Sequence, residues 1–121
     1  MIYKKSTDGE HIVKKDYSKR IILSATDFIE KGHLLQVVTI PSNTKQRSHA
    51  HRIQTEVFYI LDGECVITIN GQDYIAVSGD AFICSPGDTH NLWNKSDNEF
   101  KLAVFKINLP EGDDDTEWQE E

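Results

Sequence analysis

Two histidines separated by one residue, His49 and His51, are followed at position 56 by a glutamate. Imidazole nitrogens and carboxylate oxygens are common ligands of transition metals. On a helix, side chains two residues apart point about 200° away from each other, so these imidazoles could not share an ion. On a strand they lie on the same face. The pair therefore predicts an extended segment whose two imidazoles can converge on one metal ion.

Glu56 has the opposite parity to the two histidines and would face away from them on one continuous strand. The polar stretch 52–55 predicts a change of direction, after which Glu56 opens a new strand. Along that strand Glu56, Phe58 and Ile60 share a face. An unpaired carboxylate among apolar side chains is very costly, so an inward-facing Glu56 needs a partner, and a metal ion would be one.

A third histidine, His90, follows the tight turn Ser85-Pro86-Gly87-Asp88. Turns of this kind place side chains at the mouth of a barrel, where functional residues gather. Strand pairing in a closed barrel can bring His90 close to residues 49–56. Three imidazoles and one carboxylate make a mixed nitrogen and oxygen site, which suits Fe, Mn, Ni, Cu, Co or Zn rather than Ca or Mg.

Short runs rich in Val, Ile, Phe and Tyr recur along the chain and must position these residues. Turn residues separate the runs, as at Asp62-Gly63, and an Asn-Gly pair such as Asn70-Gly71 is the strongest short hairpin signal. No stretch has a sustained helical period, although residues 24–32 could form one helical turn. The pattern predicts an all-β sandwich or barrel. Four aromatic residues are expected in its core: Phe58, Tyr59, Phe82 and Trp93.

The length of 121 residues suits one domain. No apolar run is long enough for a membrane span, and residues 1–16 lack a signal-peptide core, so we expect a cytoplasmic protein without a membrane partner. Cys65 and Cys84 are expected to be free thiols in that compartment. No basic face is concentrated enough to predict a nucleic-acid partner.

The net charge of −7 is concentrated at the C-terminal end, because residues 111–121 carry seven acids and no base. This segment has too little apolar content to fold on its own. We therefore expect a single domain over residues 1–110, with a motif core at 43–94, and an acidic, disordered tail over 111–121. The tail would aid solubility, and a docking role is the alternative.

The residues around the candidate ligands resemble two motifs of the cupin superfamily. The first family motif reads G-x5-H-x-H-x3,4-E-x6-G, and the matching positions here are Asn43, His49, His51, Glu56 and Gly63. The second reads G-x5-P-x-G-x2-H-x3-N, and the matching positions are Gly79, Ser85, Gly87, His90 and Asn94. Asn43 replaces a glycine but tolerates positive φ. Ser85 replaces a proline, and the adjacent Pro86 keeps the turn stiff.

The resemblance implies a small single-domain barrel of the jelly-roll type, also called a double-stranded β-helix. It implies that one divalent transition metal is held by a set of four side chains: His49, His51, Glu56 and His90. It does not decide among Fe, Mn, Ni, Zn, Co and Cu. The resemblance also implies a homodimer in which N-terminal strands pack across the interface.

Four protein ligands on an octahedral ion leave two open positions for a small polar or acidic substrate. The resemblance implies dioxygenase chemistry with iron, and isomerase, lyase or decarboxylase chemistry with Zn, Mn or Ni. Glu56 is the candidate catalytic proton acceptor if it loosens from the metal. The alternatives are a non-catalytic barrel that binds or senses a small molecule, and an interaction protein with an incidental metal. Three flanking bases could steer an anionic substrate: Lys45, Arg47 and Arg52.

Overall fold

The computed structural model of this protein describes residues 1–112 and 114–119. Its regular structure is β-strand apart from a short 3-10 helix, η1 (Ala25–Asp27), which lies where the sequence predicts a helical turn. The strands are β1 (Glu10–Val13), β2 (Ser18–Leu23), β3 (Leu34–Ile40), β4 (Thr44–Lys45), β5 (His49–His51), β6 (Thr55–Asp62), β7 (Glu64–Ile69), β8 (Gln72–Val77), β9 (Ala81–Cys84), β10 (His90–Asn94), β11 (Phe100–Ile107) and β12 (Thr116–Trp118). The predicted all-β fold is confirmed.

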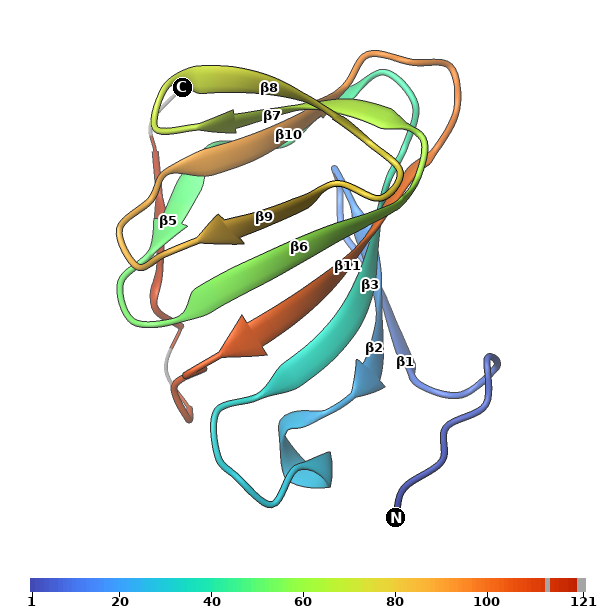
Figure 1. Cartoon of the computed structure of the whole chain (residues 1–121), viewed down its shortest axis with the longest axis vertical. Helices are drawn as coiled ribbons and strands as arrows, with labels where there is room; N and C mark the ends of the chain where they lie inside the picture. The colour runs from blue at the N-terminus through green and yellow to red at the C-terminus, as the bar shows by residue number, and fades with distance from the viewer. Residues whose placement is uncertain (113, 120–121) are drawn as a thin grey trace.

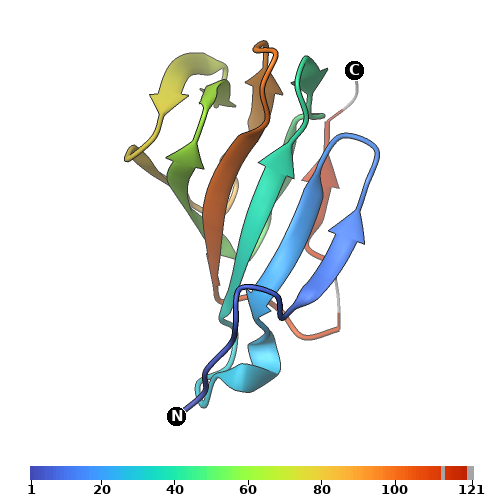
Figure 2. The ribbon, with the colours of Figure 1, turned by 90° about the vertical axis from the view of Figure 1, so that its right-hand side faces the viewer.

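The strands form two sheets that face each other (Figure 1). One has the order β1-β2-β3-β11-β6-β9, and the other has the order β12-β5-β10-β7-β8, with β4 also paired to β10. Paired strands run antiparallel. Figure 2 shows the strands from β1 through β3 and β11 to β6 side by side in one twisted sheet. The arrangement is the double-stranded β-helix that the motifs imply.

The core lies between the two sheets and takes its side chains from alternate positions of the facing strands. Glu56, Phe58 and Ile60 are all buried along β6, as their shared parity predicts. Tyr59 and Trp93 were wrongly assigned to this core, since they are 50% and 37% exposed. They occupy outward positions on β6 and β10, so their aromatic character did not decide their burial.

The turns follow the residues that favour positive φ. Asn70 and Gly71, with φ of 51° and 81°, join β7 to β8 in the tight hairpin that an Asn-Gly pair predicts. Asn43 has φ of 52°, which explains how it can replace the glycine of the family motif. Asn94 is fully buried, and its amide donates to the carbonyl oxygens of Ile40 and Asn98, at 3.1 and 2.8 Å. It therefore supports the loop that follows β10.

The C-terminal segment corrects the expectation of a disordered tail over 111–121. Residues 116–118 form β12, which pairs antiparallel with β5, and Asp115 is 1% exposed. The prediction is wrong for residues 114–119 because composition alone treats acidic residues as solvated. The free edge of β5 offers backbone partners, and the bend after it offers donors to Asp115. Residues 113, 120 and 121 of the expected tail lie outside the described residues.

Both cysteines are buried free thiols, Cys65 in β7 and Cys84 at the end of β9. Burial raises the pKa of each thiol to about 12, so neither is ionised near neutral pH.

Among the described residues, none of the helical structure has the length and apolar character needed to cross a bilayer.

Candidate metal centre

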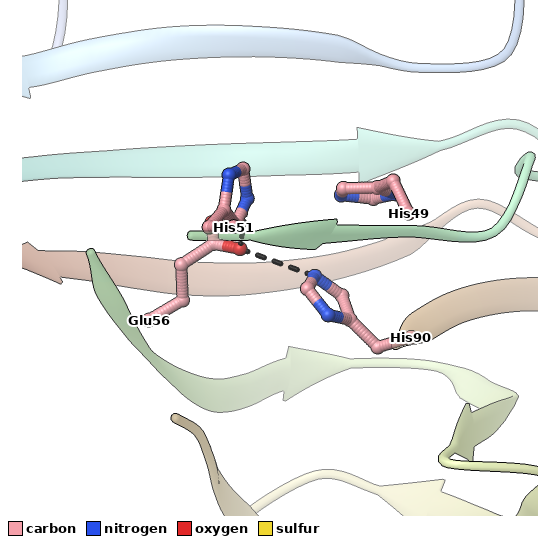
Figure 3. Close-up of side chains that lie close together, drawn as sticks. All are labelled: His49, His51, Glu56 and His90. Atoms are coloured by element: carbon pink, nitrogen blue, oxygen red, sulfur yellow. Dashed lines mark hydrogen bonds and ion pairs between the residues drawn. The ribbon is translucent and has the colours of Figure 1, made fainter. Parts of the chain in front are cut away.

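Three separate strands bring the sequence-predicted site residues together. β5 carries His49 and His51, and the chain bends before Glu56 enters β6. His90, at the start of β10, pairs directly with His49 across the sheet. Figure 3 shows the four side chains pointing toward one another inside the barrel. The parity argument for the two histidines and for the inward turn of Glu56 is thus confirmed.

The donor atoms of the cluster are close enough to share one ion. One ligand atom from each of the four side chains lies within 4.8 Å of the others, and all four residues are buried. The Nε2 atoms of His51 and His90 lie 2.8 and 3.1 Å from the same oxygen of Glu56, Oε1 (Figure 3). The rings of His49 and His90 have centroids 4.4 Å apart.

The outward nitrogen of each imidazole is fixed by a further contact. The Nδ1 atoms of His49 and His90 each lie 3.1 Å from a backbone carbonyl oxygen, that of Arg47 and that of Asp88. A carbonyl oxygen only accepts, so Nδ1 must carry the proton in both rings. The opposite nitrogen, Nε2, faces the cluster and is the one that would bind a metal, which in His90 would replace the present contact with Glu56.

Two residues of the C-terminal segment contact the imidazole of His51. Its Nδ1 lies 3.1 Å from the hydroxyl oxygen of Thr116 and 3.4 Å from Oδ1 of Asp115. A carboxylate behind a metal-binding imidazole fixes its orientation and raises its basicity. The Nε2 atoms of the imidazoles and the carboxylate of Glu56 thereby converge on one point, where a cation could be bound by all of them. The residues therefore fit a cupin metal site.

The protonation states in the cluster suit metal binding. Burial lowers the pKa of His49 to about 4, with a further contribution from the nearby His90, so this imidazole is neutral at neutral pH. Burial alone would raise the pKa of Glu56, but hydrogen bonds from His51 and His90 outweigh it and hold that pKa well below its usual range. A neutral imidazole and an ionised carboxylate are the forms that bind metals.

Asp115 connects the C-terminal segment to the bend between β5 and β6. Its Oδ2 accepts from the backbone N–H groups of Ile53 and Gln54, at 3.0 and 2.9 Å, and its Oδ1 accepts from the Gln54 side chain at 2.7 Å. The bend separates His51 from Glu56, so Asp115 fixes the relative position of two candidate ligands. Sequence reasoning missed this role because the residue lies in an acidic run that looked solvated.

The four clustered side chains line a cavity of about 600 Å³ between the two sheets. Apolar side chains such as Phe58 and Leu102 form part of its wall, and β12 contributes Thr116 and Trp118. Its size falls in the range of small-molecule sites, roughly 300 to 1,000 Å³. Further polar residues of the wall were not singled out from the sequence: Lys14, Lys15, Lys19, Gln36, Gln46 and Lys106. Strand parity was an available signal for Lys19, Gln36 and Lys106, whereas the other three residues lie outside the strands.

The three basic residues that flank the histidines in sequence do not line this cavity. Lys45 lies over the ring of Trp93, with its Nζ atom 4.7 Å from the ring centroid. Arg47 lies over Trp118, and Arg52 pairs with the exposed Glu117 at 3.4 Å. Closeness in sequence to a metal ligand therefore did not predict which bases face the interior.

The fold and the cluster together define a double-stranded β-helix with a candidate metal site inside its barrel. The chain belongs to the cupin family, because the family model described as "Cupin domain" matches residues 36–106, more than half of its length. A comparison with curated proteins finds no match.

Solved structures share the fold. A predicted oxalate decarboxylase from Thermotoga maritima has a TM-score of 0.77 at 24% identity, over 88% of this chain and 98% of that one. KdgF from Halomonas sp. has a TM-score of 0.77 at 11% identity, over 92% and 96%. The polyketide cyclase RemF from Streptomyces resistomycificus has a TM-score of 0.76 at 19% identity, over 89% and 80%. At these identities the likeness shows the fold alone.

Proposed function

We propose that this chain is a metal-dependent enzyme that acts on a small polar or acidic molecule. The observation that carries the proposal is the convergence of four buried donor side chains on the wall of a cavity large enough for a substrate. Three imidazoles and one carboxylate favour a transition metal, one of Fe, Mn, Ni, Zn, Co or Cu. The residues that would hold it are His49, His51, Glu56 and His90.

The cluster supports oxygenase, isomerase or lyase chemistry, including decarboxylation. An ion bound there would supply Lewis-acid polarisation of a substrate oxygen, and a redox-active ion would add electron transfer. The carboxylate of Glu56 is ionised at neutral pH and is our candidate for the group that accepts and returns a proton. The apolar wall formed by Phe58 and Leu102 would keep bulk water away from the reacting atoms.

The first test is the metal content of the protein, purified without chelator or added metal and measured by mass spectrometry. We expect about one equivalent of a single transition metal, lost in the His49→Ala, Glu56→Ala double variant. His11→Ala is the matched control, because His11 is an exposed histidine on β1. No metal as purified and none taken up on titration would contradict the proposal.

The metal found selects the activity screen. Iron would call for oxygen uptake with small organic acids and phenols, and zinc, manganese or nickel would call for isomerase and lyase assays. Turnover that is lost in His49→Ala, and kept in His11→Ala, would support an enzyme. A ligand that binds tightly to the loaded protein and is recovered unchanged would instead support the alternative, a non-catalytic binding or sensing barrel.

We further propose a cytoplasmic homodimer. Buried, unpaired Cys65 and Cys84 favour a reducing compartment. β1 is an edge strand, and apolar residues at and before it, including Tyr3 and Val13, are highly exposed. A second copy packed against this edge would cover both the strand and these side chains. Light scattering after size-exclusion chromatography tests this, and a strictly monomeric mass would contradict it.

A further inference from the structure

Two lysines occupy positions on the inward face of the first sheet, where apolar residues are expected. Along β11 the buried residues alternate, and Lys106 continues the inward series two residues after Val104. On β2, Lys19 pairs with Val38, a core residue of β3, so the two side chains share the inward face. Both lysines are partly buried and line the cavity. An inward charge on a core face needs a partner.

A buried amide lies between the two lysines. Strand pairing places Gln36 of β3 opposite Val104, which is two residues before Lys106 on β11. On β3 itself, Gln36 is two residues before Val38, the partner of Lys19. Gln36 is 4% exposed, lines the cavity, and has no hydrogen-bond partner for its Oε1 atom among the described residues. Lys106, Gln36 and Lys19 thus form a polar track across the inward face of the sheet, next to Glu56, which pairs with Lys106.

A second buried amide, Gln46, lines the same cavity. It is 9% exposed, and its Oε1 atom also lacks a partner in the described part of the chain. Buried polar groups in native structures are rarely left without a hydrogen bond. Two such amides on the wall of one cavity therefore point to a ligand that carries polar groups.

Lysines slightly outnumber acids on the cavity wall, although the chain as a whole has a net charge of −7. Its wall holds four lysines, at positions 14, 15, 19 and 106, and three acids, at positions 16, 56 and 114. Neither Lys19 nor Lys106 forms an ion pair within the described residues. Burial lowers the pKa of Lys19, and so do the nearby charges of Lys106 and Lys14. These ammonium groups are therefore close together, and the carboxylate opposite Lys106 in the strand register, that of Glu56, is already in contact with His51 and His90.

We propose that Lys19 and Lys106 bind an anionic group, a carboxylate or a phosphate, of a substrate whose other end reaches the His49 cluster. Gln36 and Gln46 would bond to hydroxyl or amine groups between the two ends. The substrate class is then a small molecule with an anionic group at one end and metal-binding oxygen atoms at the other. This inference rests on the proposed function and narrows its substrate.

The test compares succinate with succinamate, which has the same length but carries an amide in place of one carboxylate. Binding is measured by calorimetry on the zinc-loaded protein. We expect succinate to bind at least about tenfold more tightly, since charge-assisted hydrogen bonds are the stronger ones. Lys19→Met and Lys106→Met should each abolish most of that preference. Lys106→Arg, which keeps the charge, should retain it.

Lys101→Met is the matched control, because Lys101 is an exposed, outward residue on the same strand as Lys106. It should leave the preference for succinate unchanged, and the zinc content of every variant checks that the barrel is intact. Tighter binding of 3-phosphonopropionate than of succinate would identify the anion as phosphate, and the reverse would identify it as carboxylate. Equal affinity for succinate and succinamate, or a preference unchanged in both methionine variants, would overturn the inference.

The same titrations on metal-free protein separate this inference from the proposed function. A protein that takes up no metal, yet prefers succinate through Lys19 and Lys106, would retain the anion site and contradict the metalloenzyme. A protein that binds one metal but shows no dependence on these lysines would contradict the anion site alone.

Discussion

The Glu56 carboxylate is the residue on which the cluster depends most directly. Oε1 of Glu56 is shared by His51 and His90, whose Nε2 atoms lie 2.8 and 3.1 Å away. Each of these rings is fixed at Nδ1 by a separate contact, so the rings cannot turn away without losing a hydrogen bond. The negative charge of the carboxylate therefore compensates whatever positive charge these imidazoles, or an ion between them, carry.

Glu56→Gln should lower the affinity for a divalent transition metal by at least about tenfold, because a neutral amide replaces an anionic ligand of the same shape. Competition with a chelating dye measures the affinity. Glu64→Gln is the control, since Glu64 is an exposed residue of β7, and it should bind metal like the unmodified protein. Equal affinity in the Glu56 variant would remove this residue from the ligand set.

At the scale of elements, β12 covers the strand that carries two of the candidate ligands. Both carboxylate oxygens of Asp115 accept hydrogen bonds from the bend at residues 53–54. Asp115→Asn replaces one of these oxygens with an amide N–H group, which cannot accept, so at least one hydrogen bond is lost. We expect a loss of about 1–3 kcal/mol in unfolding free energy. We also expect metal affinity to fall by about tenfold, because the support of His51 is weakened.

Urea unfolding and metal titration of the Asp115 variant check these two effects. Glu117→Gln is the matched control, because Glu117 is an exposed neighbour on β12 that pairs with the exposed Arg52. It should change neither quantity. A lower free energy of unfolding with unchanged metal affinity would mean that Asp115 stabilises the bend without positioning His51.

The connection between β6 and β7, which carries the chain from one sheet to the other, depends on Gly63. This residue has φ of 91°, and a Cβ atom there would lie 2.9 Å from the backbone oxygen of Glu99. Gly79 has a similar φ of 94°, but a Cβ atom there meets nothing within 4 Å. Gly79→Ala should therefore cost about 1 kcal/mol from backbone strain, and Gly63→Ala should cost clearly more because the backbone must also move. Equal thermal stability of the two variants would contradict this.

Local patterns predicted two kinds of feature well. One is a turn in which a particular residue type controls the backbone, and the other is the alternation of side chains between the two faces of a strand. The Asn70-Gly71 hairpin and the shared face of Glu56 and Phe58 are examples. Pairing between distant segments was not predictable in this way. β12 pairs with β5 across about half of the chain, and a run of acids gives no local sign of it. The inward Lys106 was missed because a charged residue at the end of a strand reads as solvated.

Over the whole molecule acids are in excess, whereas lysines slightly outnumber acids on the cavity wall. The net charge is −7, and the cavity wall carries four lysines and three acids. The positive groups come from β2, β11 and the turn before β2, outside the two motifs that supply the four clustered residues. The candidate metal ligands and the lysines proposed to select the substrate therefore come from different parts of the chain.

The stability of the metal-free protein should depend on pH through His49. Burial lowers its pKa from 6.5 to about 4, so between these values the unfolded chain binds a proton that the folded protein does not. The stabilisation is full above about pH 6.5 and is lost as the pH falls toward 4, by about 3 kcal/mol in unfolding free energy. Urea unfolding across this range measures it. His49→Gln should flatten the dependence and His11→Gln should not, and an equal slope in both variants would assign the effect to another group.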